Sequence, residues 1–252
     1  MSYSTGTKRG ELAILGCLIA IGLIVGGWAL GAQIKAVRLG DRYVSVRGLA
    51  ERTVKSDLAI WPISYTETGD VLPSLYLKSE ADQKIILKFL AQQGIHPSEI
   101  AIGIVGVTDT QANLYAGNRK PLFRYIVRQD ITVRTTRVDQ AAAAAQLATG
   151  LLQQGILISQ SLTYKFNGLN AVKPDMITEA TQNARSAAER FALDSGSSVG
   201  AIRQATQGFF SILPANSGAA ADSEGGYYGG DADSSLMKTV RVVTDVQYYL
   251  EK

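Results

Sequence analysis

The chain has 252 residues, a formal net charge of +3, 46% hydrophobic residues and 19% charged residues. This balance is ordinary for a globular chain with one membrane segment, and without a clustered basic face it excludes nucleic-acid binding. The only cysteine is Cys17 and the only histidine is His96, in a turn before a proline. Because zinc sites need several such ligands and a Ser-His-Asp triad needs a positioned histidine, we expect no metal, no cofactor and no catalytic residues of these kinds.

Residues 12–34 form a hydrophobic segment without a charged residue, bounded by Glu11 and Lys35. About 20 apolar residues suffice for a helix to cross a bilayer. The segment is longer than the apolar core of a cleaved signal peptide, about 7–15 residues, although small residues near its end are also compatible with cleavage. We predict a transmembrane signal-anchor helix between a short cytoplasmic tail (1–11) and a linker (35–42).

The charges that flank this segment favour one orientation. Lys8 and Arg9 precede it, and positive residues favour the cytoplasmic side. Lys35, Arg38 and Arg42 come after it and nearly cancel that bias. A short N-terminal signal-anchor still favours translocation of the C-terminal part, so we predict that residues 35–252 lie outside the cytoplasm.

Four glycines of the segment have the spacing of helix-packing motifs. Gly22 with Gly26, and Gly27 with Gly31, form two small-xxx-small pairs. Such glycines let two membrane helices approach closely, although glycine is also common in membrane helices in general. The four positions predict a membrane-helix packing face through which copies of the chain associate.

Residues 43–252 alternate strand and helix patterns, which predicts one α+β domain with mixed or antiparallel sheets and three main helices. Residues 43–48 and 58–66 have the alternation and composition of strands, and Pro62 places the second at a sheet edge or a bulge. A helix with proline in its first turn is predicted over residues 73–93.

Further strands are predicted over residues 100–108 and 123–135. The second alternates apolar with polar side chains, as on a sheet with one exposed face. An alanine-rich helix is predicted over residues 138–154, and a strand over residues 156–166.

The last predicted helix covers residues 174–194 and opens with Pro174. A narrow stripe at steps of three and four predicts close packing against a sheet or helix, and consists of Ile177, Ala180, Ala184, Ala187 and Phe191. Two strands, over residues 199–213 and 238–250, end the domain. The segment between them, 214–235, is rich in Gly, Ala, Ser and Asp, which predicts a mobile loop.

Two kinds of acidic group are candidates for chemistry. Paired carboxylates could catalyse general acid–base reactions, if Asp57 approached Glu67 or Asp109 approached Asp130. Four loop residues carry oxygen ligands suited to calcium, namely Asp222, Glu224, Asp231 and Asp233. Their spacing matches no EF-hand, and acidic residues in such loops are usually solvated. An enzyme and an ion-binding module are therefore alternatives to a non-enzymatic role.

Four strings, in order and spacing, carry a resemblance to a known family over about residues 43–250. They are Val46-Arg47-Gly48-Leu49-Ala50-Glu51, Leu90-Ala91-Gln92-Gln93-Gly94-Ile95, Tyr125-Ile126-Val127-Arg128-Gln129-Asp130-Ile131-Thr132-Val133, and Ala184-Arg185-Ser186-Ala187-Ala188-Glu189-Arg190-Phe191-Ala192 with Gly196 and Gly200 after it. The chain resembles the SIMPL-domain family of bacterial envelope proteins, which includes the periplasmic immunogenic proteins.

The resemblance implies an extracytoplasmic α+β domain that assembles into rings or larger oligomers, with a loose link to oxidative-stress defence and no established enzymatic mechanism. It supplies no catalytic, cofactor-binding or metal-binding residues. With the predicted anchor, it leads to a non-enzymatic, single-pass protein of the bacterial inner membrane whose C-terminal domain lies in the periplasm. Its expected partners are the membrane and other copies of itself, and a periplasmic ligand- or ion-binding module is the alternative, beside an enzyme of unrecognised type.

Overall fold

A computed structural model describes residues 42–112, 122–215 and 232–251, and a few residues nearer the N-terminus, namely 16, 20–24 and 26–28. The described part is an α+β protein with antiparallel sheets, as predicted. It divides into two compact units: unit 1 comprises residues 1–49, 180–208 and 243–252, and unit 2 comprises residues 50–179 and 209–242.

Most of the predicted transmembrane segment, residues 12–34, lies outside the described residues. The few that are described are helical and include Gly22, Gly26 and Gly27, whereas Gly31 lies outside. No helix in the described part of the chain is long and apolar enough to cross a membrane. The structure therefore gives no support for the predicted span, which rests on the sequence.

The six-stranded sheet of unit 2 is built on two long antiparallel strands, β2 (Leu58–Gly69) and β5 (Tyr125–Thr135). Short strands flank them: β3 (Ile100–Ile102) and β4 (Gly106–Asp109) pair with β5, while β6 (Ile158–Gln160) and β7 (Thr163–Lys165) pair with β2. Each of the predicted strands 100–108 and 156–166 is thus two short strands.

Contacts with the neighbouring long strand accompany both breaks. The Gly103 N–H donates to the Asp130 carbonyl oxygen at 2.7 Å, and a Cβ at Gly103 would lie 2.9 Å from that oxygen, so only glycine fits between β3 and β4. β6 pairs with residues 63–65 and β7 with residues 58–60. Pro62 therefore lies in a central strand, opposite the break, and the prediction of an edge or bulge was wrong. Its missing N–H costs no ladder bond there.

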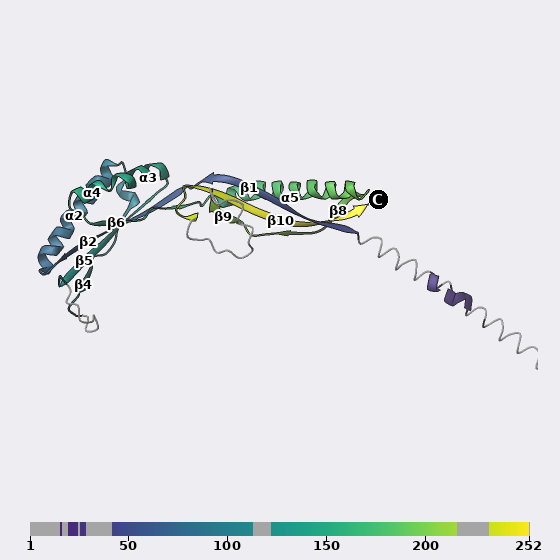
Figure 1. The fold of residues 1–252 in the computed structure, drawn as a ribbon, viewed down its shortest axis with the longest axis horizontal. Helices are drawn as coiled ribbons and strands as arrows, with labels where there is room; N and C mark the ends of the chain where they lie inside the picture. The colour runs from purple at the N-terminus through teal and green to yellow at the C-terminus, as the bar shows by residue number, and fades with distance from the viewer. Residues whose placement is uncertain are drawn as a thin grey trace, which may run out of the picture. The chain divides into compact units, whose positions relative to one another are not determined.

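Three helices, α2 (Leu72–Gln92), α3 (Val138–Leu147) and α4 (Gly150–Gln153), cover one face of this sheet (Figure 1). α2 has nearly its predicted bounds, but the predicted helix 138–154 is interrupted between α3 and α4. A 3-10 turn, η1 (Pro97–Glu99), leads into β3. Alternate side chains of β2 and β5 point to the helices and form the core, which includes Trp61, Ile63, Ile86, Leu90, Ile131, Val133, Ala144, Ala148 and Leu151.

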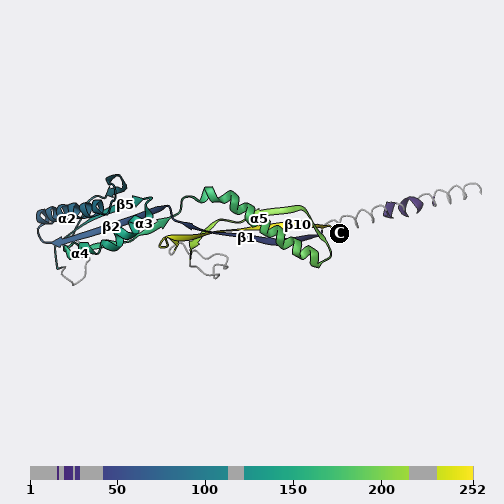
Figure 2. The same cartoon turned by 90° about the horizontal axis from the view of Figure 1, so that it is seen from above.

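From residue 42 on, the described part of unit 1 is a smaller sheet against which one helix packs. It contains the start of β1 (Tyr43–Lys55), the end of β10 (Met237–Glu251), β8 (Ser198–Gln207) and the C-terminal part of α5 (Leu169–Asp194). β10 lies between β1 and β8 in the strand order, and β9 (Ser211–Pro214) pairs with the part of β10 in unit 2. The predicted strand 199–213 is broken between β8 and β9. α5 lies along β1 and β10 (Figures 1 and 2).

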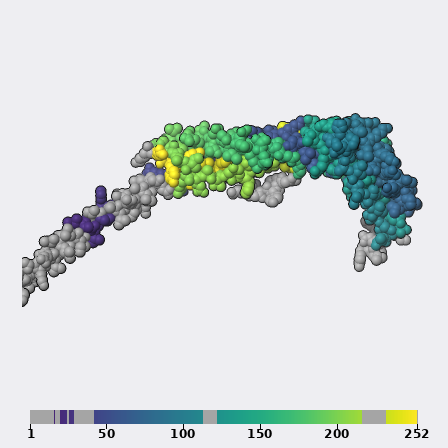
Figure 3. All heavy atoms as spheres, turned by 180° about the vertical axis from the view of Figure 1, so that it is seen from behind, coloured from purple at the N-terminus to yellow at the C-terminus, as the bar shows by residue number. Residues whose placement is uncertain are grey.

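α5 begins before Pro174, so this proline lies inside the helix and the prediction that it opens the helix was wrong. The buried side chains recur at every fourth position, and are Met176, Ala180, Ala184, Ala188 and Ala192. Of the predicted alanine-rich stripe, Ala180 and Ala184 are buried as predicted, whereas Phe191 is exposed. The outer side of α5 faces solvent along its length (Figure 3).

Gly48 explains why this stripe is made of alanine. A Cβ added at Gly48 would overlap the carbonyl oxygen of Ala180 and lie 2.8 Å from the amide nitrogen of Ala184. The backbone of β1 and that of α5 are therefore in direct contact, without side chains between them.

We predict that Gly48→Ala lowers the free energy of unfolding by about 1–3 kcal/mol, because the strand and helix must separate to admit one methyl group. Urea denaturation measures the loss. Gly150→Ala is the matched control, because a Cβ at Gly150 meets no atom within 4 Å, and it should cost nothing. Equal losses in the two variants would contradict the prediction.

Candidate functional site

At one end of unit 2 the apolar core gives way to a buried polar cluster. The inward row of β2 continues from Trp61 and Ile63 to Tyr65 and Glu67, and Glu67 is only 5% exposed. Glu67 occupies an inward position of the strand, so its carboxylate is buried beneath α2 by the same alternation that buries the core.

Tyr65 is held by hydrogen bonds from both sides. The register places it opposite Gln129 on β5, and its hydroxyl lies 2.5 Å from Gln129 Oε1 and 3.1 Å from the carbonyl oxygen of Ser79 on α2. Gln129 Nε2 donates to the carbonyl oxygen of Gly103 at 3.0 Å. Burial, chiefly, raises the pKa of Tyr65, and the nearby acidic groups Asp82 and Glu67 add to this rise.

Glu67 and Asp82 form a buried carboxyl pair beside one lysine. Lys78 Nζ lies 2.6 Å from Glu67 Oε2, and this hydrogen bond raises the pKa of Lys78. Asp82 is 7% exposed, and its Oδ2 is buried without a hydrogen-bond partner in the described part of the chain. Burial, first, and then a hydrogen bond to Glu67 and its negative charge raise the pKa of Asp82 to about 6, against the attraction of Lys78.

A hydrogen bond between two carboxyl groups requires a proton on one of them. With one proton on Asp82, the pair and Lys78 together carry no net charge, whereas an ionised Asp82 would leave an excess buried negative charge. The raised pKa of Asp82 therefore favours one proton on this carboxyl group in mildly acidic solution.

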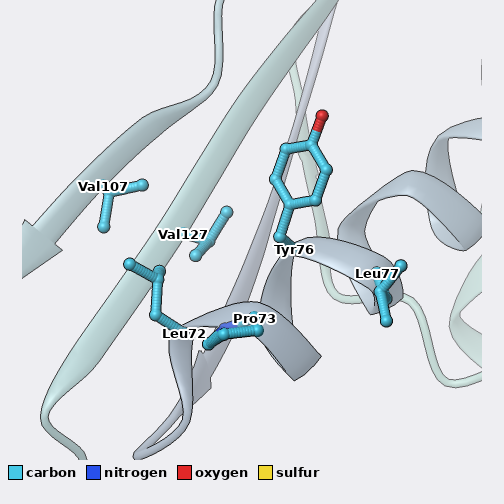
Figure 4. Close-up of a pocket in the computed structure, with 6 residues that line it drawn as sticks. All are labelled: Leu72, Pro73, Tyr76, Leu77, Val107 and Val127. Atoms are coloured by element: carbon cyan, nitrogen blue, oxygen red, sulfur yellow. The ribbon is translucent and has the colours of Figure 1, made fainter.

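An apolar hollow of about 520 Å³ lies beside this cluster. Its lining comes from the first two turns of α2 and from the neighbouring strands, and consists of Leu72, Pro73, Tyr76, Leu77, Val107 and Val127 (Figure 4). Val127 is the cross-strand neighbour of both Glu67 and Val107. The same stretch of α2 thus lines the hollow on one side and covers Glu67 on another.

Exposed apolar side chains continue from the hollow along the edge of the sheet that β3 and β4 form. Ile104, between β3 and β4, is 94% exposed, and Ile102 and Val107 are exposed on the strands themselves. On α2, Tyr76 and Leu77 are exposed. We call these five residues the apolar edge. Among the described strands, β3 and β4 pair with β5 alone, so each has one side on which no described strand pairs.

Comparison with known families agrees with this architecture. A family model described as SIMPL, protein of unknown function (DUF541), matches residues 44–248, which is most of the chain. The chain belongs to the SIMPL family. No curated protein matches the sequence. Since the family description assigns no activity, the function of this SIMPL protein has to be argued from its own residues.

The carboxylate pairs that we considered from the sequence do not come together. Asp57, just before β2, accepts the backbone N–H groups of Asn167 and Gly168, far along the strand from Glu67. Asp109 lies opposite Tyr125 and pairs with Arg124 at 3.1 Å, whereas Asp130 is five positions further along β5. Glu67 does lie beside another carboxyl group, but it is that of Asp82 rather than Asp57.

The missed partner, Asp82, had a signal in the sequence. The buried stripe of α2 consists of Leu75, Ser79, Asp82, Ile86 and Leu90, at steps of three and four. A carboxylate between Leu75 and Ile86 on one helical face indicates a buried charge, and a buried charge needs a partner.

Three of the four candidate calcium ligands, Asp222, Glu224 and Asp231, lie outside the described residues. Asp233 is described, and its carboxylate pairs with Lys165 while its carbonyl oxygen accepts the Tyr164 N–H. The described residues include no group of three or more side chains suited to a metal ion. His96 directly precedes η1, and its backbone N–H donates to the carboxylate of Glu99, the last residue of η1, at 2.8 Å.

A second buried charge lies near Asp233. Lys238 on β10 is buried and donates to the carbonyl oxygen of Ala232. Burial lowers the pKa of Lys238, and Lys165 lowers it further, against the attraction of Asp233. This lysine ties the chain before β10 to the strand.

We predict that Lys78→Ala lowers the free energy of unfolding of this SIMPL protein by about 1–3 kcal/mol near pH 7, because it leaves the buried Glu67 carboxylate without its cation. Urea denaturation is the measurement. Lys84→Ala removes the exposed pair with Glu80 on the same helix and should change stability by less than about 0.5 kcal/mol. An effect of Lys78→Ala no larger than that of Lys84→Ala would show that the ion pair does not stabilise the cluster.

Proposed function

We propose that this SIMPL protein is a non-enzymatic, membrane-anchored protein of the bacterial envelope that assembles with copies of itself through the apolar edge of unit 2. The observation that carries the proposal is the grouping of exposed Ile102, Ile104 and Val107 on the open side of a sheet, next to an apolar hollow.

An open strand edge with exposed apolar side chains favours association. Its free N–H and C=O groups are a template for pairing with another strand, and proteins that stay monomeric usually protect such edges with charges, prolines or coverage. β3 and β4 carry isoleucine and valine at exposed positions instead. Contiguous apolar surface of this kind is typical of protein–protein contact sites, and a second copy of the chain offers a strand edge of the same length and chemistry.

A non-enzymatic role agrees with the chemistry of unit 2. The Glu67–Asp82 pair lies beneath α2 rather than in an open cleft, and Glu67 is neutralised by Lys78. The hollow that does open to solvent is lined by apolar side chains. A catalytic pocket needs polar groups that converge on a substrate, and the lining of this hollow supplies only the Tyr76 hydroxyl.

The anchor rests on the apolar segment 12–34 and on the charges before it. With the N-terminus in the cytoplasm, the SIMPL domain lies in the periplasm. The glycines Gly22, Gly26, Gly27 and Gly31 provide a second surface for association, in the membrane. A link to envelope or oxidative stress is drawn from the family resemblance alone.

We expect Ile104→Lys and Leu77→Lys each to convert the oligomer into smaller species, because a charge on either residue must be desolvated at the contact. Sedimentation or light scattering of full-length protein in mild detergent gives the mass. Leu157→Lys is the matched control, since Leu157 is 71% exposed, close to the 66% of Leu77, and precedes β6 at the other side of the sheet. An oligomer that survives both edge variants, or that Leu157→Lys disrupts equally, would exclude the apolar edge as the contact.

A second measurement separates the two surfaces. We expect a defined multimer both for full-length protein in detergent and for residues 36–252 alone, with the same number of subunits. Assembly of the full-length form only would assign association to the glycine face of the membrane segment. Monomers in both preparations would refute self-assembly and direct attention to a ligand or a different protein.

A further inference from the structure

We propose that Glu67 and Asp82 act as a proton-dependent latch that holds the first half of α2 against the sheet and so sets the shape of the apolar hollow. The latch itself is independent of the proposed function, and only its effect on assembly depends on it.

The latch is built from two elements that approach each other with carboxyl groups between them. Asp82 projects from the buried stripe of α2, and Glu67 from the inward row of β2. The charged or titratable groups that face Asp82 are Tyr65 and Glu67 of β2 and Lys78 of α2 itself. β5 presents Val127 and Gln129 on this side, since its Arg128 and Asp130 are exposed on the other.

The unpartnered oxygen is the feature that makes this contact sensitive to protons. Asp82 Oδ2 is buried and accepts no hydrogen bond in the described part of the chain. Without a proton, Asp82 Oδ2 is an acceptor that has no donor. With a proton, Asp82 donates to the neighbouring Glu67 carboxylate, and this hydrogen bond joins α2 to β2. Loss of that proton leaves two buried carboxylates side by side with one lysine, which repel.

The direction of the pH dependence is set by the raised pKa of Asp82. The folded form binds this proton up to about pH 6, whereas an unfolded aspartate releases it near pH 4. The latch therefore stabilises the fold fully below about pH 4, and this contribution is lost as the pH rises to about 6. Above that pH the pair opposes the docking of α2.

The shape of the hollow depends on this change because the first turns of α2 form part of its lining. Leu72, Pro73, Tyr76 and Leu77 precede Asp82 on α2 by about one and a half to three turns. A helix moves as a rigid element over such a length, so release of Asp82 from Glu67 shifts the lining side chains relative to Val107 and Val127 on the sheet.

The test compares full-length protein in mild detergent with Asp82→Asn, Glu67→Gln and, as the matched control on the same helix, Glu80→Gln. The amide group introduced by Asp82→Asn keeps a donor toward Glu67 at every pH. Amide hydrogen exchange of α2 and denaturant unfolding are measured from pH 4 to 8, with exchange corrected for its intrinsic pH dependence.

In the wild type and in Glu80→Gln we expect the opening constant of the first half of α2 to rise on the order of 100-fold between pH 4 and 7. In Asp82→Asn and Glu67→Gln this rise should be absent. Equal pH dependence in all four proteins would overturn the latch. If a variant fails to fold, a carbon-13 titration of the wild-type aspartate carboxyls decides instead: a buried aspartate that titrates near 6 supports the latch, and its absence refutes it.

The link to assembly is measured separately, by the mass of wild type and Asp82→Asn at pH 5 and pH 7.5. We expect the wild-type oligomer to change with pH and the variant to keep its state. The exchange experiment is repeated on Ile104→Lys. If the exchange of α2 in that variant still depends on pH while its mass no longer changes, the latch is supported even if the apolar edge proves not to be the contact.

Discussion

The arrangement of unit 2 depends on one row of side chains, the inward row of β2. Because alternate residues of a strand point to the same face, this row carries Trp61 and Ile63 into the apolar core and then Tyr65 and Glu67 into the polar cluster. β5 continues each position across the register, with Val133 and Ile131 opposite the first two and Gln129 and Val127 opposite the last two. The core and the candidate site are therefore two ends of one packed surface, and α2 has to match both.

Much of this arrangement could be predicted from periodicity. The alternation in residues 123–135 correctly identified β5, and the helix predicted over residues 73–93 has nearly the observed bounds of α2. In two of the predictions that failed, a non-local contact was the cause. Gly103 breaks one strand because Asp130 comes close to it, and Pro62 is tolerated in a central strand because β6 and β7 leave a gap opposite it. Neither contact can be recognised from the residues next to Gly103 or Pro62 in the sequence.

The candidate site was predicted only in part, for a similar reason. Glu67 was a candidate because it is a carboxylate on a strand, but its partner was sought among other acidic residues near strands. Asp82 lies on the buried stripe of a helix 15 positions later in the chain. The prediction of a helix over residues 73–93 did not consider which of its polar residues share the buried face, so Asp82 was not a candidate. The alternation of a strand and the stepping of a helix have to be combined before such a pair is found.

The energetics of the carboxyl pair indicate that it has a role beyond stabilising the fold. A well-packed apolar pair at the positions of Glu67 and Asp82 would in general be as stable as a buried charged group, or more stable. Near neutral pH the observed pair opposes folding, since Asp82 must ionise in a site that raises its pKa. The rest of unit 2 offsets this cost with the packing of Ile86 and Leu90 deeper along the same helix. The C-terminal half of α2 is consequently firmly packed. Packing of its N-terminal half, which lines the apolar hollow, depends on the protonation of Asp82. A helix packed in this way can change the surface of the apolar hollow while the core of unit 2 stays folded.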